Sequence, residues 1–181
     1  MAVKTDDGSV NTFDFKSIEE FLAQAYALEI EVAERYEEMA DAMEVHNNPE
    51  VAGLFRELAE QSQKHGAEMK ERSRNKALPR IAPWNFKWGD GDGPETPSMD
   101  KIHYLMTPYH ALDMARQAET QARDFYAGVA GNAASKEIAD LAAEFVTEEA
   151  EHVAVLESWI TKYPKPSEDW DFDPDPPGNS E

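Results

Sequence analysis

Apolar residues recur at alternating steps of three and four residues along four stretches of the chain. The stripes are Leu22, Ala25, Glu29, Val32, Tyr36, Met39 and Met43; Val51, Phe55, Leu58, Ser62, His65 and Met69; Leu112, Ala115, Glu119, Ala122, Tyr126 and Val129; and Ile138, Ala142, Phe145, Glu149, His152, Leu156 and Trp159. Residues at this spacing share one face of an α-helix. The pattern therefore predicts four amphipathic helices, over residues 17–43, 48–74, 107–131 and 135–163.

Helix start signals support these boundaries. Ser17 is followed three residues later by Glu20, which is the spacing of a capping box. Asn48 and Thr107 each precede a proline, and a capping residue before a proline is typical of a helix N-terminus. Short turns near residues 47 and 133 then join the helices in pairs, so the sequence predicts two antiparallel helical hairpins.

The long segment between the hairpins, residues 76–106, is rich in proline, glycine and aromatic residues. A connection of that length without structure of its own is uncommon, except in bundles with an end-to-end crossover. The sequence therefore predicts one all-α four-helix bundle over residues 17–163. An N-terminal extension (1–16) and an acidic, proline-rich tail (164–181) flank it.

Near its middle, each stripe is interrupted by ionisable residues. These residues are Glu29, His65, Glu119, Glu149 and His152. A buried carboxylate needs a partner, a proton or a cation, because its desolvation is costly. The interruptions lie at similar distances from the two turns, so one layer of the core can hold them all. This predicts a shared site, whereas Glu31 and Glu34 fall off the stripe and are expected to be solvated.

The composition narrows the chemistry of such a site. The chain has 181 residues, with 17 Lys and Arg against 37 Asp and Glu, which gives a formal charge of −20. A surface of this charge repels nucleic acid and anionic membranes and attracts cations. It has no cysteine, so a metal would be held by oxygen and imidazole nitrogen. No apolar leader or long apolar stretch occurs, which predicts a cytoplasmic protein.

The interrupted stripes resemble the ligand pattern of the ferritin-like di-iron carboxylate proteins, which have one Glu on each of two helices and Glu-x-x-His on the other two. Glu119-Thr-Gln-Ala-Arg-Asp-Phe-Tyr126 and Glu148-Glu149-Ala-Glu-His152 are similar to the rubrerythrin-related branch. The resemblance covers about residues 17–163. It implies a ferritin-like bundle that binds iron, two ions in the family, at Glu29, His65, Glu119, Glu149 and His152. Manganese and zinc accept the same ligands.

The chain departs from the family pattern in three respects. Ser62 stands three residues before His65, where the family has the Glu that bridges the two metals. The sequence therefore leaves open whether one ion or two are bound. Ala122 stands where the rubrerythrin branch often has a further Glu. The branch's rubredoxin-type cysteine site is absent, so an oxidoreductase of this kind would need a separate electron donor.

Several residues have two interpretations each. Tyr36 and Tyr126 follow a stripe Glu by seven residues, and their phenols either donate to ligand carboxylates or are ordinary core groups. Ser62 is either a small packing residue or a hydrogen-bond donor to a metal-bound water. His65, without a paired Glu, is either a ligand or a hydrogen-bonded core histidine.

The leading hypothesis is a non-haem di-iron oxidoreductase whose small oxidant substrate is peroxide or dioxygen. One alternative is iron storage, ferroxidation or metal buffering. Another is a structural or interaction protein with a weakened metal site, which Ser62 favours. The expected partners are metal ions and further copies of the chain, in a homodimer or larger homo-oligomer; nucleic acid and membranes are not expected.

Overall fold

The computed structural model describes residues 14–74, 76–88 and 92–174. It contains the helices α1 (Ile18–Val45), α2 (Pro49–Arg72), α3 (Pro108–Asn132) and α4 (Lys136–Ile160), and the 3₁₀ turns η1 (Pro83–Asn85) and η2 (Met99–Lys101). No β-strand occurs in these described ranges, and the predicted all-α four-helix bundle is confirmed. Residues 1–13 of the predicted extension and 175–181 of the predicted tail lie outside the described part of the chain.

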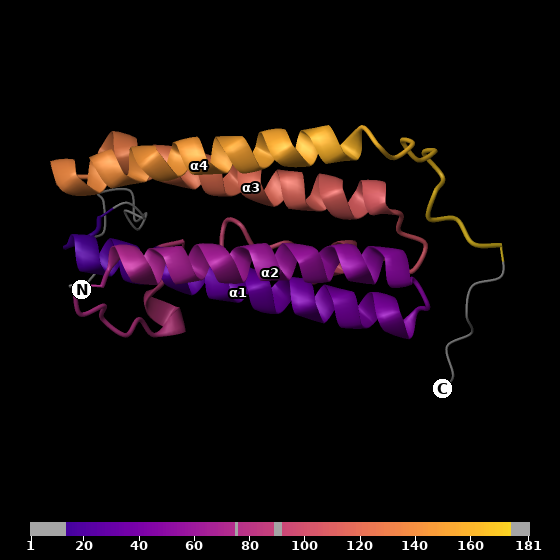
Figure 1. Ribbon diagram of the computed structural model, residues 1–181, viewed down its shortest axis with the longest axis horizontal. Helices are drawn as coiled ribbons and strands as arrows, with labels where there is room; N and C mark the ends of the chain where they lie inside the picture. Colours follow the sequence, from indigo (N-terminus) through magenta and orange to yellow (C-terminus); the bar gives the residue numbers. More distant parts are fainter. Residues whose placement is uncertain (1–13, 75, 89–91, 175–181) are drawn as a thin grey trace, which may run out of the picture.

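The four helices form two antiparallel hairpins that pack against each other (Figure 1). The α1–α2 pair lies below the α3–α4 pair in that view, and the apolar stripes fill the space between them. Phe55 and Phe145 are completely buried, and Phe21 stacks on Phe145 with ring centroids 5.6 Å apart. Each large apolar side chain buried in this way contributes about 1.5–3 kcal/mol. The core therefore runs the length of the bundle, and the interrupted layer lies within it.

The helices begin where the capping residues predict. The Ser17 hydroxyl accepts a hydrogen bond from the Glu20 N–H, and the Asn48 side chain accepts one from the N–H of Val51. The ends differ by a few residues: α2 ends at Arg72 instead of 74, and α4 ends at Ile160, before Pro164. A residue that precedes proline avoids the helical conformation, so the chain leaves α4 before it reaches Pro164.

The segment between α2 and α3, called the crossover here, runs along the bundle against α1. Polar side chains bind its backbone at Asn85 and Lys87, and again at Met106 just before α3. The Gln24 amide donates to the carbonyl of Asn85 at 3.1 Å and accepts from the N–H of Lys87 at 2.8 Å. The Asn48 amide donates to the carbonyl of Met106 at 2.7 Å. These bonds satisfy backbone groups that a long connection would otherwise leave to water.

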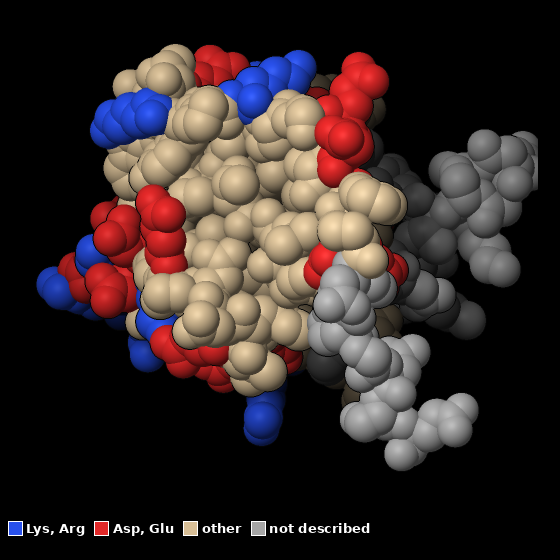
Figure 2. Space-filling model, turned by 90° about the vertical axis from the view of Figure 1, so that its right-hand side faces the viewer, with Lys and Arg blue, Asp and Glu red and all other residues tan. Residues whose placement is uncertain are grey.

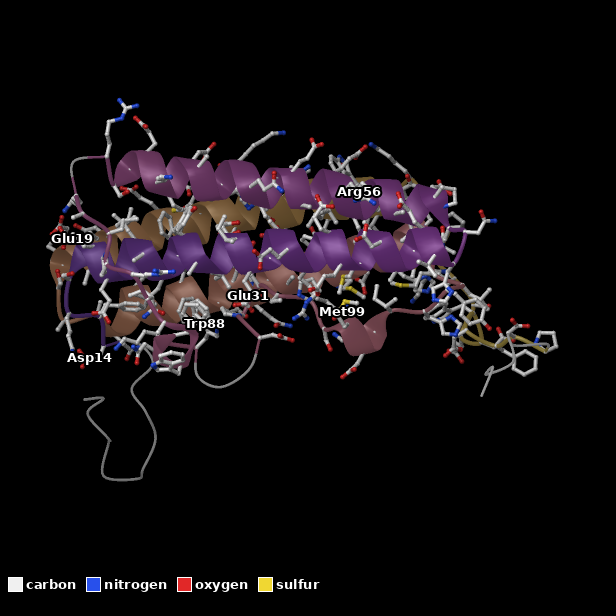
Figure 3. All side chains as sticks on the ribbon, turned by 90° about the horizontal axis from the view of Figure 1, so that it is seen from below. Asp14, Glu19, Glu31, Arg56, Trp88 and Met99 are labelled. Carbon is white, nitrogen blue, oxygen red and sulfur yellow. The ribbon has the colours of Figure 1, made fainter. Side chains whose placement is uncertain are left out.

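The middle of the crossover is held by Glu31 and Arg35 of α1. The Glu31 carboxylate accepts from the Gly93 N–H at 2.8 Å and from the Thr96 hydroxyl at 3.0 Å. Arg35 makes two parallel bonds to the carboxylate of Asp92. The expectation that Glu31 is solvated is therefore wrong. Glu31 lies outside the apolar stripe, but the crossover covers that side of α1. Figure 3 shows Glu31 on the side of α1 along which the crossover runs.

The end of the bundle where α1 turns into α2 carries mainly uncharged residues, with both acidic and basic residues around them (Figure 2). The described part of the tail lies against the nearby crossover and the start of α3. The Trp170 ring centroid is 3.8 Å from that of His110, and the Tyr104 hydroxyl donates to Asp173 at 2.7 Å. Within the described ranges no helix is long and apolar enough to span a membrane.

Candidate metal centre

Glu29 of α1 and Glu149 of α4 are buried carboxylates in the middle of the core, with residue exposures of 1% and 3%. Their burial follows from the helical period. Ala25 and Val32 lie one turn before and one turn after Glu29 on the same face, and both are buried. Packing of that apolar face against the other hairpin therefore carries the carboxylate into the interior.

Glu119 of α3 completes a compact group with two residues of α4. The Nδ1 atom of His152 lies 3.0 Å from Oε2 of Glu149 and 3.5 Å from Oε2 of Glu119. One ligand atom from each of the three residues lies within 4.8 Å of the others. Glu149 and His152 share a face because they are three residues apart on a helix. Atoms at these separations can bind one cation between them.

His65 of α2 lies beside this group. Its ring stacks on that of His152, with centroids 4.3 Å apart and planes at 4° to each other. Its Nδ1 atom is 3.8 Å from Oε1 of Glu29. The structure thus brings together all five residues of the predicted ligand set, from four helices. Their roles as ligands stay a prediction.

Glu95 of the crossover is a further carboxylate at this layer that sequence reasoning missed. It is 1% exposed, and one of its carboxylate oxygens lies within 4.8 Å of oxygens of Glu29 and Glu149. Among the described residues, Oε2 of Glu95 and Oε2 of Glu29 have no hydrogen-bond partner. Glu95 lies outside the helices, so helical periodicity carries no signal for it.

Burial keeps several of these carboxyl groups protonated. It raises the pKa of Glu29 and Glu95 well above the ordinary value, and the charges of neighbouring carboxylates add to the effect. Burial also raises the pKa of Glu149 to about 8, with a further contribution from its hydrogen bond to Glu119. In the metal-free protein, protons therefore take the place of cations in this layer.

Glu119 and His152 form the ionic part of the cluster. Burial opposes ionisation of Glu119, but its hydrogen bonds to His152 and Glu149 lower its pKa below the ordinary value. Burial likewise opposes the charge on His152, yet the two carboxylates raise its pKa to about 10. The pKa of His65 is lowered, first by burial and then by the charge of His152. One imidazole is therefore cationic and the other neutral near pH 7.

Three residues predicted to support the ligands are also in the core. Ser62 is buried, and its hydroxyl donates to the Leu58 carbonyl of its own helix at 3.4 Å. The Tyr126 hydroxyl is buried without a hydrogen-bond partner among the described residues and makes no bond to a carboxylate in this structure. Tyr36 stacks on Phe55 with centroids 6.0 Å apart. Roles of the three toward a bound metal stay predictions.

Comparisons with known proteins agree with the four-helix fold. The family model described as "Ferritin-like domain" matches residues 17–162. The chain belongs to this ferritin-like family. The chain is similar to an uncharacterized conserved protein from Magnetospirillum magnetotacticum MS-1, whose crystal structure is known. The two sequences are 48% identical, and the structures match with a TM-score of 0.61. The match covers 83% of this chain and 98% of that protein's chain. No curated protein matches the chain.

A pocket of about 270 Å³ connects the carboxylate–histidine cluster with the surface between α2 and α4. It is lined by Glu29, His65, Glu68, Met69, Glu148, Glu149, Glu151 and His152. Glu68 and Glu151 are exposed, whereas Glu29 and Glu149 are buried. The pocket therefore leads from an acidic rim to the cluster, and its lining attracts cations.

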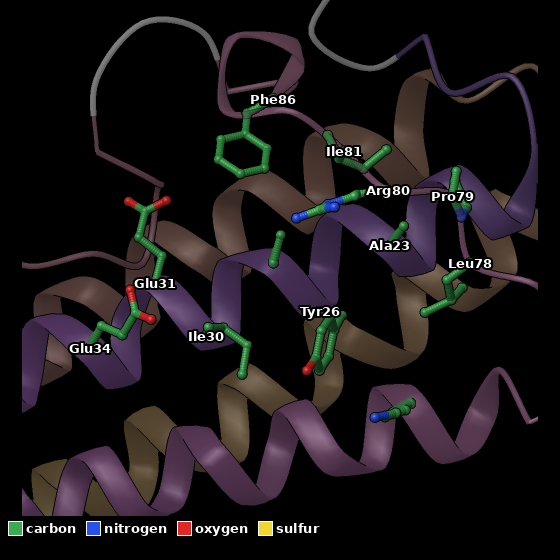
Figure 4. A pocket seen from close by; sticks show the side chains of 12 residues that line it. Ala23, Tyr26, Ile30, Glu31, Glu34, Leu78, Pro79, Arg80, Ile81 and Phe86 are labelled. Atoms are coloured by element: carbon green, nitrogen blue, oxygen red, sulfur yellow. The ribbon is translucent and has the colours of Figure 1, made fainter.

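A larger hollow of about 670 Å³ lies elsewhere, between the outer face of α1 and the crossover. Figure 4 shows Tyr26, Ile30 and Phe86 along it, with Glu31 at one end. The residues that line it are mostly apolar, and none of the five predicted ligands is among them. This hollow is therefore separate from the carboxylate–histidine cluster.

We expect the metal-free protein to lose stability as the pH rises from about 5 to about 8. In this window folded Glu149, with its pKa near 8, keeps a proton that the unfolded chain releases near 4.5. Each such carboxyl lowers the free energy of unfolding by up to about 1.4 kcal/mol per pH unit. The raised pKa values of Glu29, Glu95 and His152 act in the same direction. His65 and His110, whose pKa values are lowered first by burial, oppose them.

Urea unfolding at several pH values in the presence of a chelator measures this slope. Glu149→Gln removes one titrating carboxyl and should give a flatter dependence on pH. The matched control Glu57→Gln changes an exposed carboxylate of α2 and should leave the slope as it is. A stability that increases over the window would contradict the expectation.

Proposed function

We propose that this ferritin-like protein binds iron, as two ions, at Glu29, His65, Glu119, Glu149 and His152, and acts as an oxidoreductase on peroxide or dioxygen. The observation that carries the proposal is the meeting of these groups, from four helices, in one buried layer. Carboxylate oxygen and imidazole nitrogen are donors that iron accepts. Bound iron would supply the redox chemistry and open coordination positions for a small oxidant.

The chain's own residues have distinct tasks in this proposal. The carboxylates and imidazoles hold the cations, and the surrounding aromatic and aliphatic side chains restrict access from bulk water to the pocket between α2 and α4. Glu149 retains a proton near neutral pH, since burial raises its pKa to about 8, so cation binding releases that proton. Metal affinity should therefore increase with pH across the neutral range.

Electrons and assembly are further parts of the proposal. The sequence has no cysteine, so it offers no thiolate for an iron–sulfur or rubredoxin-type site. We therefore assign electron supply to a separate donor. We also expect the chain to form a homodimer or a larger homo-oligomer.

Metal analysis of protein purified without added metal tests the proposal. We expect about two equivalents of Fe²⁺ per chain after anaerobic loading, and a loss of at least half of them in a Glu149→Gln/His152→Ala double variant. Glu57→Gln again serves as the control with unchanged binding. Wild-type protein that takes up less than about 0.2 equivalents would rule out the metal site.

The behaviour of loaded protein separates oxidoreductase from storage protein. An oxidoreductase should consume peroxide repeatedly when a reductant is present and should run on gel filtration as a small oligomer. Retention of a large excess of oxidised iron by a large oligomeric shell would favour storage instead, because a dimer encloses no space for a mineral.

The acidic rim of the pocket between α2 and α4 gives a kinetic prediction. Glu68→Gln/Glu151→Gln should slow Fe²⁺ uptake several-fold at low ionic strength and leave the final stoichiometry unchanged, because these exposed charges attract the cation without ligating it. Stopped-flow uptake at two salt concentrations measures the effect. Glu57→Gln/Glu157→Gln, with the same charge change on the same helices but away from the pocket, should take up Fe²⁺ at the wild-type rate.

A further inference from the structure

The predicted ligands fall into two halves. Glu119, Glu149 and His152 form the half on α3 and α4, and Glu29 and His65 form the half on α1 and α2. Ser62 lies three residues before His65 on α2, and its hydroxyl is bonded to its own helix. A hydroxyl has one oxygen and no charge, so it cannot serve as a bridging carboxylate.

We propose that Glu95 is a metal ligand that joins the two halves, so that the crossover supplies the carboxylate that α2 lacks at Ser62. This inference rests on the proposed function. Glu95 lies within 4.8 Å of a carboxylate oxygen from each half, Glu29 on one side and Glu149 on the other. A carboxylate between two cations can offer one oxygen to each.

The burial of Glu95 gives an independent reason to assign it a ligand. Its residue exposure is 1%, and its Oε2 atom has no hydrogen-bond partner among the described residues. A buried carboxylate oxygen without a partner is strongly disfavoured, and the carboxylates of Glu29 and Glu149, which lie within 4.8 Å of Glu95, add negative charge beside it. A cation is the partner that satisfies Glu95 and its neighbours together.

Charge balance points in the same direction. Without Glu95 the cluster has the carboxylates of Glu29, Glu119 and Glu149, which supply a charge of −3 when ionised. Two divalent ions carry +4, so this set leaves one positive charge in the core. Glu95 brings the ligand charge to −4 and makes the loaded layer neutral, which is the favourable state for charges removed from water.

The crossover is built to hold Glu95 at this place. Glu31 of α1 binds the N–H of Gly93 and the hydroxyl of Thr96, on either side of Glu95. A Cβ atom on Gly93 would lie 2.3 Å from Cδ1 of Leu28, which is completely buried. A side chain at position 93 would therefore force either Leu28 or the crossover to move, and the present approach to α1 places Glu95 in the bundle.

Anaerobic Fe²⁺ titration of the full chain, with metal analysis after equilibrium dialysis, tests the assignment. Glu95→Gln should lower tight binding from about two ions per chain to one, or weaken the second by about tenfold or more. Ser62→Glu/Glu95→Gln should restore two tight ions, because the double variant returns a carboxylate from α2. Circular dichroism and the melting temperature in chelator confirm that the variants are folded.

The outcomes separate this inference from the proposed function. If Glu95→Gln keeps two tight ions, the inference is overturned and the proposed function stands. If the double variant does not restore the ion that Glu95→Gln loses, the shared role with position 62 is overturned. Wild-type protein that binds no iron overturns both proposals.

Gly93→Ala tests the placement of Glu95 without changing a ligand. The added methyl group should displace the crossover and reproduce the loss of the second ion, while the first ion remains bound. Gly53→Ala is the matched control, since a Cβ atom at Gly53 of α2 meets no atom within 4 Å. Two tight ions in Gly93→Ala would overturn the role assigned to the close approach to α1.

Discussion

Four carboxyl groups and two imidazoles share one layer of an otherwise apolar core, and the fold has to neutralise the charge of that layer. Protons do so in the metal-free chain: burial raises the pKa of Glu29, Glu95 and Glu149, and cationic His152 offsets Glu119. The same burial excludes water that could otherwise solvate the carboxylates. Cations and protons therefore compete for one set of oxygens, so that folding, pH and metal binding are linked.

The helices and five residues of the candidate site could be predicted from the sequence because helical periodicity reports which side chains face the core. Glu29 and Glu149 belong to apolar stripes, and the structure buries both. Periodicity says nothing about a connection, so Glu95 could not be found. Periodicity also identifies the face of a helix that is buried in the bundle, but it does not identify what covers the other faces. For this reason the sequence does not predict that the crossover covers Glu31.

The crossover explains why a long connection is compatible with a compact bundle here. Gln24, Glu31 and Arg35 lie along one side of α1, next to the apolar stripe, and each binds the crossover. Their spacing of seven and four residues keeps them on a common face of the helix. This second, polar stripe on α1 makes the crossover a fifth packing element of the bundle, and it fixes the backbone from which Glu95 extends.

A ligand on a connection differs physically from one on a helix. A helical carboxylate such as Glu149 keeps its position through the hydrogen bonds of its own backbone, whereas Glu95 keeps its position only as long as the crossover stays bound to α1. The bonds of the crossover to Glu31 and Arg35 involve partly exposed groups, which individually contribute little. Cation binding by Glu95 would therefore stabilise the crossover, and the crossover in turn would stabilise the second ion. That reciprocity follows from linkage.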